Sequence, residues 1–297
     1  MPGPITHYLF GLETSKHIKP LPVYKIIKQN RSLYLLGLQG PDPIKYYATK
    51  KSNLSYICTL MHTDKTRDFI LSALTYIKNL TPDSEEYNEC LSYMCGFICH
   101  FVLDYMLHPY IYYISGKEPL HHQKVELGID AEFLKEKFDL DAKHLKINKH
   151  VLKDIDLNSN ICKLYGETLL AIYNVEKGGD LFKASYKDMR RHYSFHLASF
   201  ISKLLHSLQT LQIEENTYLN KQKRVWHHPV TGNVYTFSVD QIFHNAMKMC
   251  YGLLQSAYEY VYCETSYDDL KYIVPNVSYY TGMPLEDKRE MKYFKSS

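Results

Sequence analysis

Two sets of histidine and carboxylate side chains stand out because their members recur every four residues. The six positions are His100, Asp104, His108, His122, Glu126 and Asp130. In an α-helix a step of four residues advances only about 40° around the axis, so each set of three projects from one helix face. Both sets lie among apolar residues, where ionisable groups are costly unless they are paired or bind a metal. We therefore predict two adjacent helices that present these groups inward.

Imidazole and carboxylate groups on facing helices are typical of metal cages in helical bundles. Zinc accepts both kinds of ligand and, as a Lewis acid, activates water at neutral pH. A surface His/Asp pair is the ordinary explanation of a single HxxxD motif. Here HxxxDxxxH is followed after fourteen residues by HxxxExxxD, and this combined pattern favours a metal site.

The ordered set of motifs resembles the zinc-dependent phospholipase C family, which is similar in its all-α, multi-zinc architecture to the single-strand-specific zinc nucleases. The matching pieces are His7, Gly40-Pro41-Asp42, Met61-His62, His100 to Asp104, His108-Pro109 and His122 to Glu126. The resemblance spans residues 7 to 130 and implies a phospholipase C-like, zinc-dependent phosphodiester hydrolase. Such an enzyme uses a metal-activated hydroxide and two to three zinc ions.

The resemblance also implies a ligand set for each zinc ion. The three sets are Asp42, His62, His100 and Asp104; His108, His122 and Glu126; and His7 with a shared Asp104 oxygen and the amine of Pro2. That amine becomes free once Met1 is removed; the alternative is that His7 merely packs against or hydrogen-bonds Asp104. Asp42 is also the expected general base, and Asp130 is expected to orient a ligand histidine.

Helical periodicity predicts the elements that position these groups. Apolar residues from Phe69 to Leu80 follow one helix face, which ends before Pro82. A cap at Asp83-Ser84 begins the next helix, which runs to about His108, where Pro109 ends or kinks it. Further helices are predicted from Pro119 and at about 160–175, 184–208 and 239–264, the last with a capping box formed by Ser238 and Gln241.

These elements predict an all-α fold, in which a multi-helix bundle surrounds an inward-facing multi-zinc site. At most one short β-hairpin is expected, within residues 225–237. Residues 1–137 are expected to form the phospholipase C-like domain that carries the metal ligands. Residues 138–297 are expected to form a C-terminal helical region that completes the bundle.

Composition and charge limit the location and the partners. The 297 residues include 45% hydrophobic ones and carry a formal net charge of +3, so the chain is globular and shows no strong nucleic-acid signal. Seven cysteines without paired spacings, and a first segment without a signal-peptide pattern, predict a cytoplasmic location. The apolar stretch from Tyr93 to Leu107 is shorter than the roughly 18 residues of a membrane span, so peripheral membrane contact is the most we expect.

Two other functions remain open. A nuclease-like phosphodiesterase acting on nucleotides needs aromatic platforms beside a positive groove. A non-catalytic, zinc-stabilised intracellular scaffold needs only closed metal sites, whereas a catalytic site keeps an open position. The 28 tyrosines are spread along the chain, so we interpret them as compositional bias rather than as a ligand pocket. We interpret Cys90, Cys95 and Cys99 as small buried hydrophobic residues.

Overall fold

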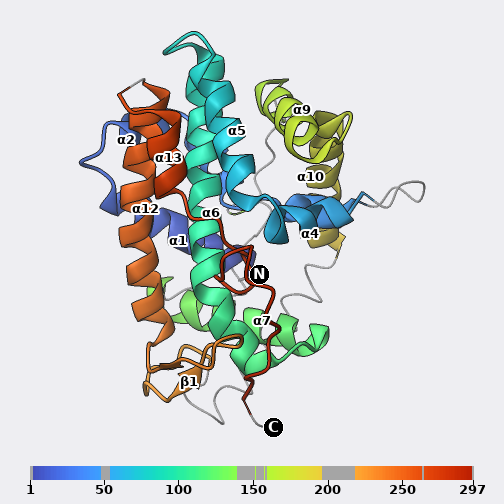
Figure 1. Ribbon diagram of the computed structural model, residues 1–297, viewed down its shortest axis with the longest axis vertical. Helices are drawn as coiled ribbons and strands as arrows, with labels where there is room; N and C mark the ends of the chain where they lie inside the picture. Colours follow the sequence, from blue (N-terminus) through green and yellow to red (C-terminus); the bar gives the residue numbers. More distant parts are fainter. Residues whose placement is uncertain are drawn as a thin grey trace.

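The computed structural model describes residues 3–47, 54–138, 151, 157, 159–195, 218–262 and 264–295. Helices make up most of this part of the chain (Figure 1). They are α1 (Pro4–His17), α2 (Val23–Gln29), α3 (Arg31–Gly37), the 3₁₀ helix η1 (Asp42–Tyr46), α4 (Tyr56–Thr63), α5 (Thr66–Lys78), α6 (Glu85–Ser115), α7 (Pro119–Phe138), α9 (Ser159–Tyr173), α10 (Gly178–Phe195), α12 (Val239–Val261) and α13 (Tyr267–Ile273). Strands β1 (Trp226–His227) and β2 (Val234–Tyr235) form an antiparallel hairpin. The predicted all-α fold with one short hairpin is confirmed.

Helix α6 lies at the centre of the bundle (Figure 1). It packs against α1, α2, α3, α5, α7, α9 and α12, so most of its faces are buried. Ser84 begins the helix as predicted, because its side chain accepts a hydrogen bond from the backbone N–H of Tyr87 at 3.2 Å. Cys90, Cys95 and Cys99 on this helix are buried thiols, which confirms their hydrophobic interpretation.

Helices α3 and α6 touch through two glycines. A Cβ atom on Gly37 would lie 2.1 Å from the carbonyl oxygen of Tyr93, and one on Gly96 would lie 2.1 Å from that of Tyr34. Neither position therefore tolerates a side chain without moving the helices apart. This close crossing brings the loop that follows α3 next to the middle of α6.

Of the two predicted effects of Pro109, that it ends or kinks the helix near residue 108, the first is wrong. Helix α6 continues through Pro109 to Ser115. A proline inside a helix lacks one backbone N–H and displaces the preceding turn, which costs about 3 kcal/mol. Burial of Tyr110 and Ile111, in the turn that follows, offsets this cost.

Helix α6 is also long and apolar enough to cross a membrane when judged by length and composition alone. Its most apolar 18-residue window has a mean hydropathy of 1.5, but 89% of that window is buried inside the protein. The core helix of a globular protein has the same properties. Helix α6 is thus longer than the apolar stretch from Tyr93 to Leu107, because it includes the turns on both sides of that stretch.

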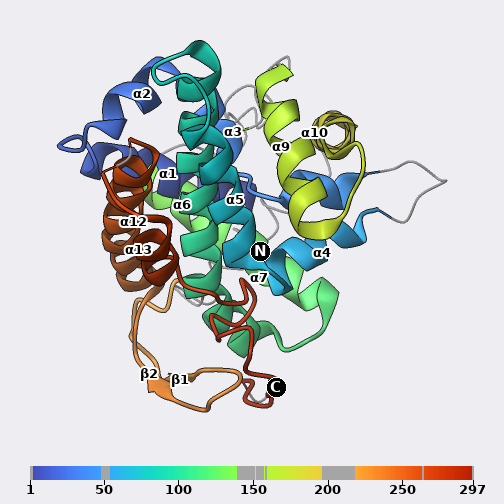
Figure 2. The ribbon, with the colours of Figure 1, turned by 45° about the horizontal axis from the view of Figure 1, so that its top comes forward.

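Two pairs of helices flank α6 (Figures 1 and 2). Helices α12 and α13 lie on one side, and α9 and α10 lie on the other. Helix α5 buries the predicted apolar face, and α12 begins with the predicted capping box of Ser238 and Gln241. The helix predicted at 184–208 corresponds to α10, which begins earlier; residues 196–208 lie outside the described residues.

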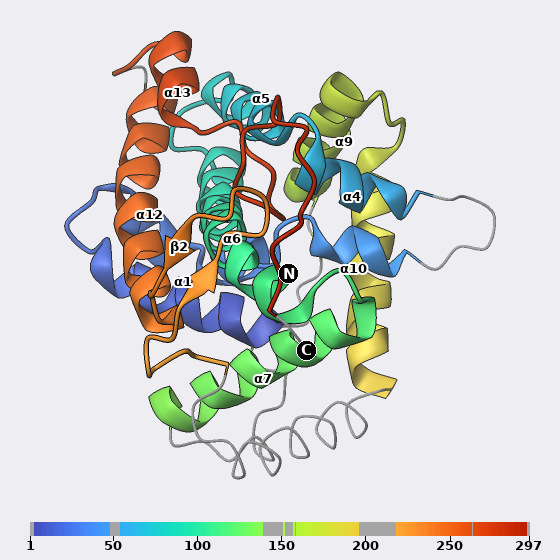
Figure 3. The same cartoon turned by 60° about the horizontal axis from the view of Figure 1, so that its bottom comes forward.

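A C-terminal segment, residues 274–295, follows α13 and crosses the bundle near α6 (Figure 3). The backbone N–H of Tyr279 donates to the carbonyl oxygen of His62 at 2.9 Å. Farther along, the N–H of Lys295 donates to the carbonyl oxygen of Tyr113 at 2.7 Å. The segment thereby connects helix α4 with helix α6.

Candidate metal centre

Helix α6 presents His100, Asp104 and His108 on one face, as their spacing predicts. All three side chains are fully buried, with no accessible surface. Polar side chains at such depth destabilise a protein unless they have partners. Their neighbours therefore define the kind of site that they form.

Three more polar side chains reach this face: His7 from α1, Asp42 from η1 and His62 from α4. Oδ1 of Asp104 lies 3.2 Å from Nε2 of His7. Its Oδ2 lies 3.2 Å from Nε2 of His100 and 3.5 Å from Nε2 of His62. Oδ1 of Asp42 lies 3.3 Å from that same His62 nitrogen. The two oxygens of Asp104 thus face different imidazoles, as expected of a carboxylate shared by two ions.

Backbone carbonyl groups orient three of the imidazoles. In each case Nδ1 donates a hydrogen bond and leaves the lone pair on Nε2, so the ring can bind zinc through Nε2. The acceptors are the carbonyl oxygens of Cys58 for His62 at 2.6 Å, Leu38 for His100 at 3.1 Å, and Tyr279 for His108 at 2.9 Å. The rings are therefore already turned toward one another.

Many buried polar atoms of this cluster have no hydrogen-bond partner among the described residues. They are Nε2 of His7, His62, His100 and His108, Oδ1 of Asp42, and both carboxylate oxygens of Asp104. Each such atom costs about 1–3 kcal/mol when nothing binds it. Imidazole nitrogens and carboxylate oxygens are the ligands that zinc accepts. The unpartnered atoms therefore fit bound zinc ions.

Electrostatics favour the protonation states that metal binding requires at three of the residues, His7, His108 and Asp104. Burial lowers the pKa of His7 and lowers that of His108 well below its usual range, so both rings are neutral. Burial opposes ionisation of Asp104, but the imidazoles of His100 and His108 hold the pKa of its carboxyl group well below the usual range. The pKa of His62 shifts the other way: burial lowers it, but Cys58 and the nearby carboxylates of Asp104 and Asp42 raise it well above its usual range, so a metal ion binding there must displace a proton.

A second group forms where α7 meets α6. His108, His122 and Glu126 offer ligand atoms that lie within 4.8 Å of one another. Nε2 of His122 is 2.9 Å from Oε1 of Glu126, and its Nδ1 lies 3.1 Å from the hydroxyl of Ser115. The rings of His108 and His122 stack with centroids 5.8 Å apart. The structure thus brings together the ligands expected for a second ion.

The motif Gly40-Pro41-Asp42 has a steric explanation. Gly40 adopts φ +51°, and a Cβ atom there would lie 2.3 Å from Cδ2 of His100. Only glycine combines this backbone angle with such a close approach to the imidazole ring. The turn then delivers Asp42 to the cluster at the start of η1.

Asp130 differs from its expected role. Its Oδ1 accepts hydrogen bonds from the backbone N–H of Thr6 at 2.8 Å and from the Thr6 hydroxyl at 2.5 Å. Thus Asp130 holds the first turn of α1, one residue before His7, instead of bonding to a ligand imidazole. Helical spacing indicates which face Asp130 occupies, but not which element packs against it. Met1 and Pro2 lie outside the described residues, so an amine ligand stays a prediction.

Two features of the centre were not predicted. Sγ of Cys58 lies 3.8 Å from Nδ1 of His62, and Asp42, Cys58 and His62 together form another possible metal-binding group. The four-residue step from Cys58 to His62 was a visible signal for this. By contrast, the contacts of Tyr279 and Tyr280 with the histidines depend on long-range packing that no local pattern reveals.

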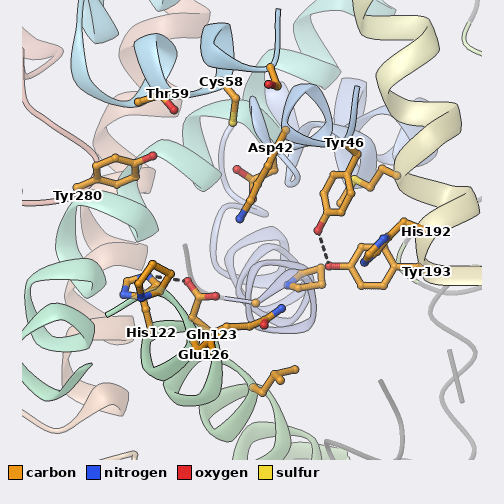
Figure 4. A pocket seen from close by; sticks show the side chains of 18 of the residues that line it. Asp42, Tyr46, Cys58, Thr59, His122, Gln123, Glu126, His192, Tyr193 and Tyr280 are labelled. Atoms are coloured by element: carbon orange, nitrogen blue, oxygen red, sulfur yellow. Dashed lines mark hydrogen bonds and ion pairs between the residues drawn. The ribbon is translucent and has the colours of Figure 1, made fainter. Parts of the chain in front are cut away.

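A cavity of about 500 Å³ opens beside the cluster (Figure 4). Asp42 lies on one wall, and His122 and Glu126 lie on the opposite one. The aromatic lining consists of Tyr46, Tyr112, Tyr193, Tyr280 and His192, and two cationic residues, Lys45 and Lys117, also line the cavity. Four of the 28 tyrosines thus gather around one cavity, although tyrosine is spread along the whole sequence.

Comparison with known proteins adds one match. A sequence profile of the family described as zinc-dependent phospholipase C matches residues 6–179, more than half of the 297-residue chain. The match extends beyond residue 130, where we expected the resemblance to end. No curated protein and no solved structure gave a significant match.

Proposed function

The chain belongs to the zinc-dependent phospholipase C family, so it is a zinc-dependent phosphoric diester hydrolase, and we propose that its substrate is a phospholipid. The observation that supports this most directly is the cavity beside the metal centre. It is lined by Asp42, His122 and Glu126, so a phosphodiester bound there lies next to expected ligands of two ions. A closed structural metal site has no such access.

The residues have separate tasks in this proposal. One zinc ion would be held by Asp42, His62, His100 and Asp104, a second by His108, His122 and Glu126, and a third by His7 and Asp104. Bound zinc supplies Lewis-acid chemistry, which polarises the phosphodiester and lowers the pKa of water. Asp42 borders the cavity, so its carboxylate is placed to accept a proton from the attacking water.

The direct test couples metal analysis with hydrolysis of a soluble diester. We expect at least two zinc equivalents per chain, because the eight expected ligands among the described residues form separate groups. The same preparation is expected to hydrolyse bis(4-nitrophenyl) phosphate, with release of nitrophenol measured by absorbance. At most one equivalent of zinc, or a zinc-loaded protein without hydrolysis, would contradict the proposal.

We propose peripheral contact with a bilayer through the cavity rim. Leu120, at the first turn of α7, is 75% exposed, and the exposed Lys117 and Lys45 also line the cavity. An exposed apolar side chain beside basic ones is typical of surfaces that bind anionic membranes.

Replacing Leu120 with Asp is expected to lower hydrolysis of phospholipid vesicles roughly 10-fold, because one inserted leucine contributes about 1.5 kcal/mol or more. Hydrolysis of the soluble diester should change little. The control is Leu170→Asp, since Leu170 is also exposed, at 48%, but lies on α9 away from the cavity. A proportional loss on both substrates would contradict a role at the membrane.

A nucleotide diester is the second candidate, because four tyrosine rings and two lysines line the cavity. Under the phospholipid proposal, a short-chain phosphatidylcholine should have a higher kcat/KM than a dinucleotide. The opposite order would favour the nuclease-like function.

We also propose a cytoplasmic location. Cys58, Cys90, Cys95, Cys99 and Cys250 are buried thiols, and free thiols are typical of a reducing compartment. Recovery of the native protein mainly in a secreted or membrane fraction would contradict this.

A further inference from the structure

Tyr280 is a cavity residue that the family match does not include. It belongs to the C-terminal segment, whereas the match ends at residue 179. Its side chain lines the cavity, and Figure 4 shows its hydroxyl group pointing inward from the wall. The residue therefore has a place at the reaction site that the family profile does not assign.

The ring of Tyr280 contacts both metal-binding groups. It stacks on His62 of the first group, with centroids 5.3 Å apart and planes 19° apart. It meets His108 of the second group edge-on, with centroids 5.7 Å apart and planes 83° apart. Tyr280 thus lies at the junction of the two groups, where a diester bound to both would place its phosphorus.

The backbone holds this position firmly. The preceding residue, Tyr279, donates its N–H to the carbonyl oxygen of His62 and accepts a hydrogen bond from Nδ1 of His108, both at 2.9 Å. The N–H of Tyr280 itself donates to the hydroxyl of Ser278 at 3.2 Å. The ring is therefore positioned before a substrate binds. This lowers the conformational entropy that the side chain loses on binding.

The Tyr280 hydroxyl is available to donate a hydrogen bond to a ligand. It makes no hydrogen bond to another described residue, whereas the hydroxyls of Tyr46 and Tyr193 across the cavity pair with each other at 3.1 Å. A phenol is a good donor, and donors aimed at a phosphate oxygen stabilise the charge that develops during hydrolysis.

We propose that Tyr280 is a substrate-binding residue whose phenol O–H donates a hydrogen bond to a non-bridging oxygen of the phosphodiester. This inference rests on the proposed function of the cavity. It extends the reaction site to a residue more than 150 positions after the last expected metal ligand, Glu126. Tyr280 would contribute to substrate binding through one hydrogen bond, from a neutral donor to a charged acceptor. Removing the single hydroxyl oxygen therefore tests the inference.

The test is Tyr280→Phe, which keeps the stacked ring and removes only the hydroxyl. Two quantities are measured on zinc-loaded protein: kcat/KM for bis(4-nitrophenyl) phosphate, and the Kd of inorganic phosphate by calorimetry. A lost hydrogen bond to a charged group predicts a change of about 10- to 100-fold in each. Zinc content and melting temperature should equal those of the wild type. The matched control is Tyr293→Phe, in the same segment but outside the cavity lining.

Values within twofold of the wild type in both measurements would overturn the inference, as would a loss of zinc in Tyr280→Phe. A wild type that does not bind phosphate would overturn it too. If the wild type hydrolyses no diester yet binds phosphate tenfold more tightly than Tyr280→Phe, the proposed function fails while this inference stands. Conversely, an active wild type with an equally active Tyr280→Phe variant, and equal phosphate affinity, refutes this inference alone.

Discussion

The Asp104→Asn variant is expected to lose hydrolysis by about 10³-fold or more, together with more than one zinc equivalent. The reason is the geometry of its carboxylate: Oδ1 faces His7 and Oδ2 faces His62 and His100, so one side chain serves two expected ions. Asn retains the shape but offers one weak oxygen ligand and no negative charge. Elemental analysis and the soluble diester assay measure the two losses.

Glu126→Gln is the matched comparison for that variant. Glu126 belongs to one metal-binding group only and is less buried than Asp104. Its amide variant should therefore lose at most one zinc equivalent and less activity. Equal losses of zinc and activity in the two variants would show that Asp104 does not bridge two ions.

Removal of zinc is expected to lower the melting temperature as well as abolish activity. The expected ligands come from α1, η1, α4, α6 and α7, so the free energy of zinc binding would be partly folding free energy. A ligand at a thousand times its Kd stabilises the native state by about 4 kcal/mol. For a chain of 297 residues that corresponds to a decrease of about 6 °C on chelation. Scanning calorimetry of the wild type with and without chelator measures it.

Readdition of zinc should restore both the melting temperature and the activity. Asp104→Asn provides the control. Because this variant is expected to hold less zinc, chelation should lower its melting temperature by less than that of the wild type. A wild type whose melting temperature is unchanged by complete zinc removal would show that the ions bind weakly at the periphery.

The sequence was informative where the signal is local. The four-residue steps along α6 and α7 predicted two inward faces, because helix geometry alone determines which side chains share a face. His7, Asp42 and His62 could be named only through the family resemblance, since they stand on separate elements without a common period. Whether these residues bind zinc as expected stays a prediction.

Other features depend on tertiary packing and were missed or wrong. Pro109 lies inside α6 because burial around it outweighs its local cost. Asp130 contacts Thr6 rather than a ligand histidine, because the neighbour of a helix face is decided by the whole fold. The same holds for Tyr279 and Tyr280, whose contacts with the centre span more than 150 residues of sequence.

The hydrogen bond between His108 and Tyr279 has a consequence for biosynthesis. Its partners are separated by 171 residues. A growing chain therefore contains every expected zinc ligand of the described residues well before Tyr279, whose carbonyl group orients His108, has been synthesised. At about 5–20 residues per second, the ribosome needs on the order of 10 to 30 s to supply it. During that interval the central helix and its buried histidines lack part of their covering. Nascent chains of this protein are therefore expected to need protection by chaperones, and metal capture is expected to follow translation rather than accompany it.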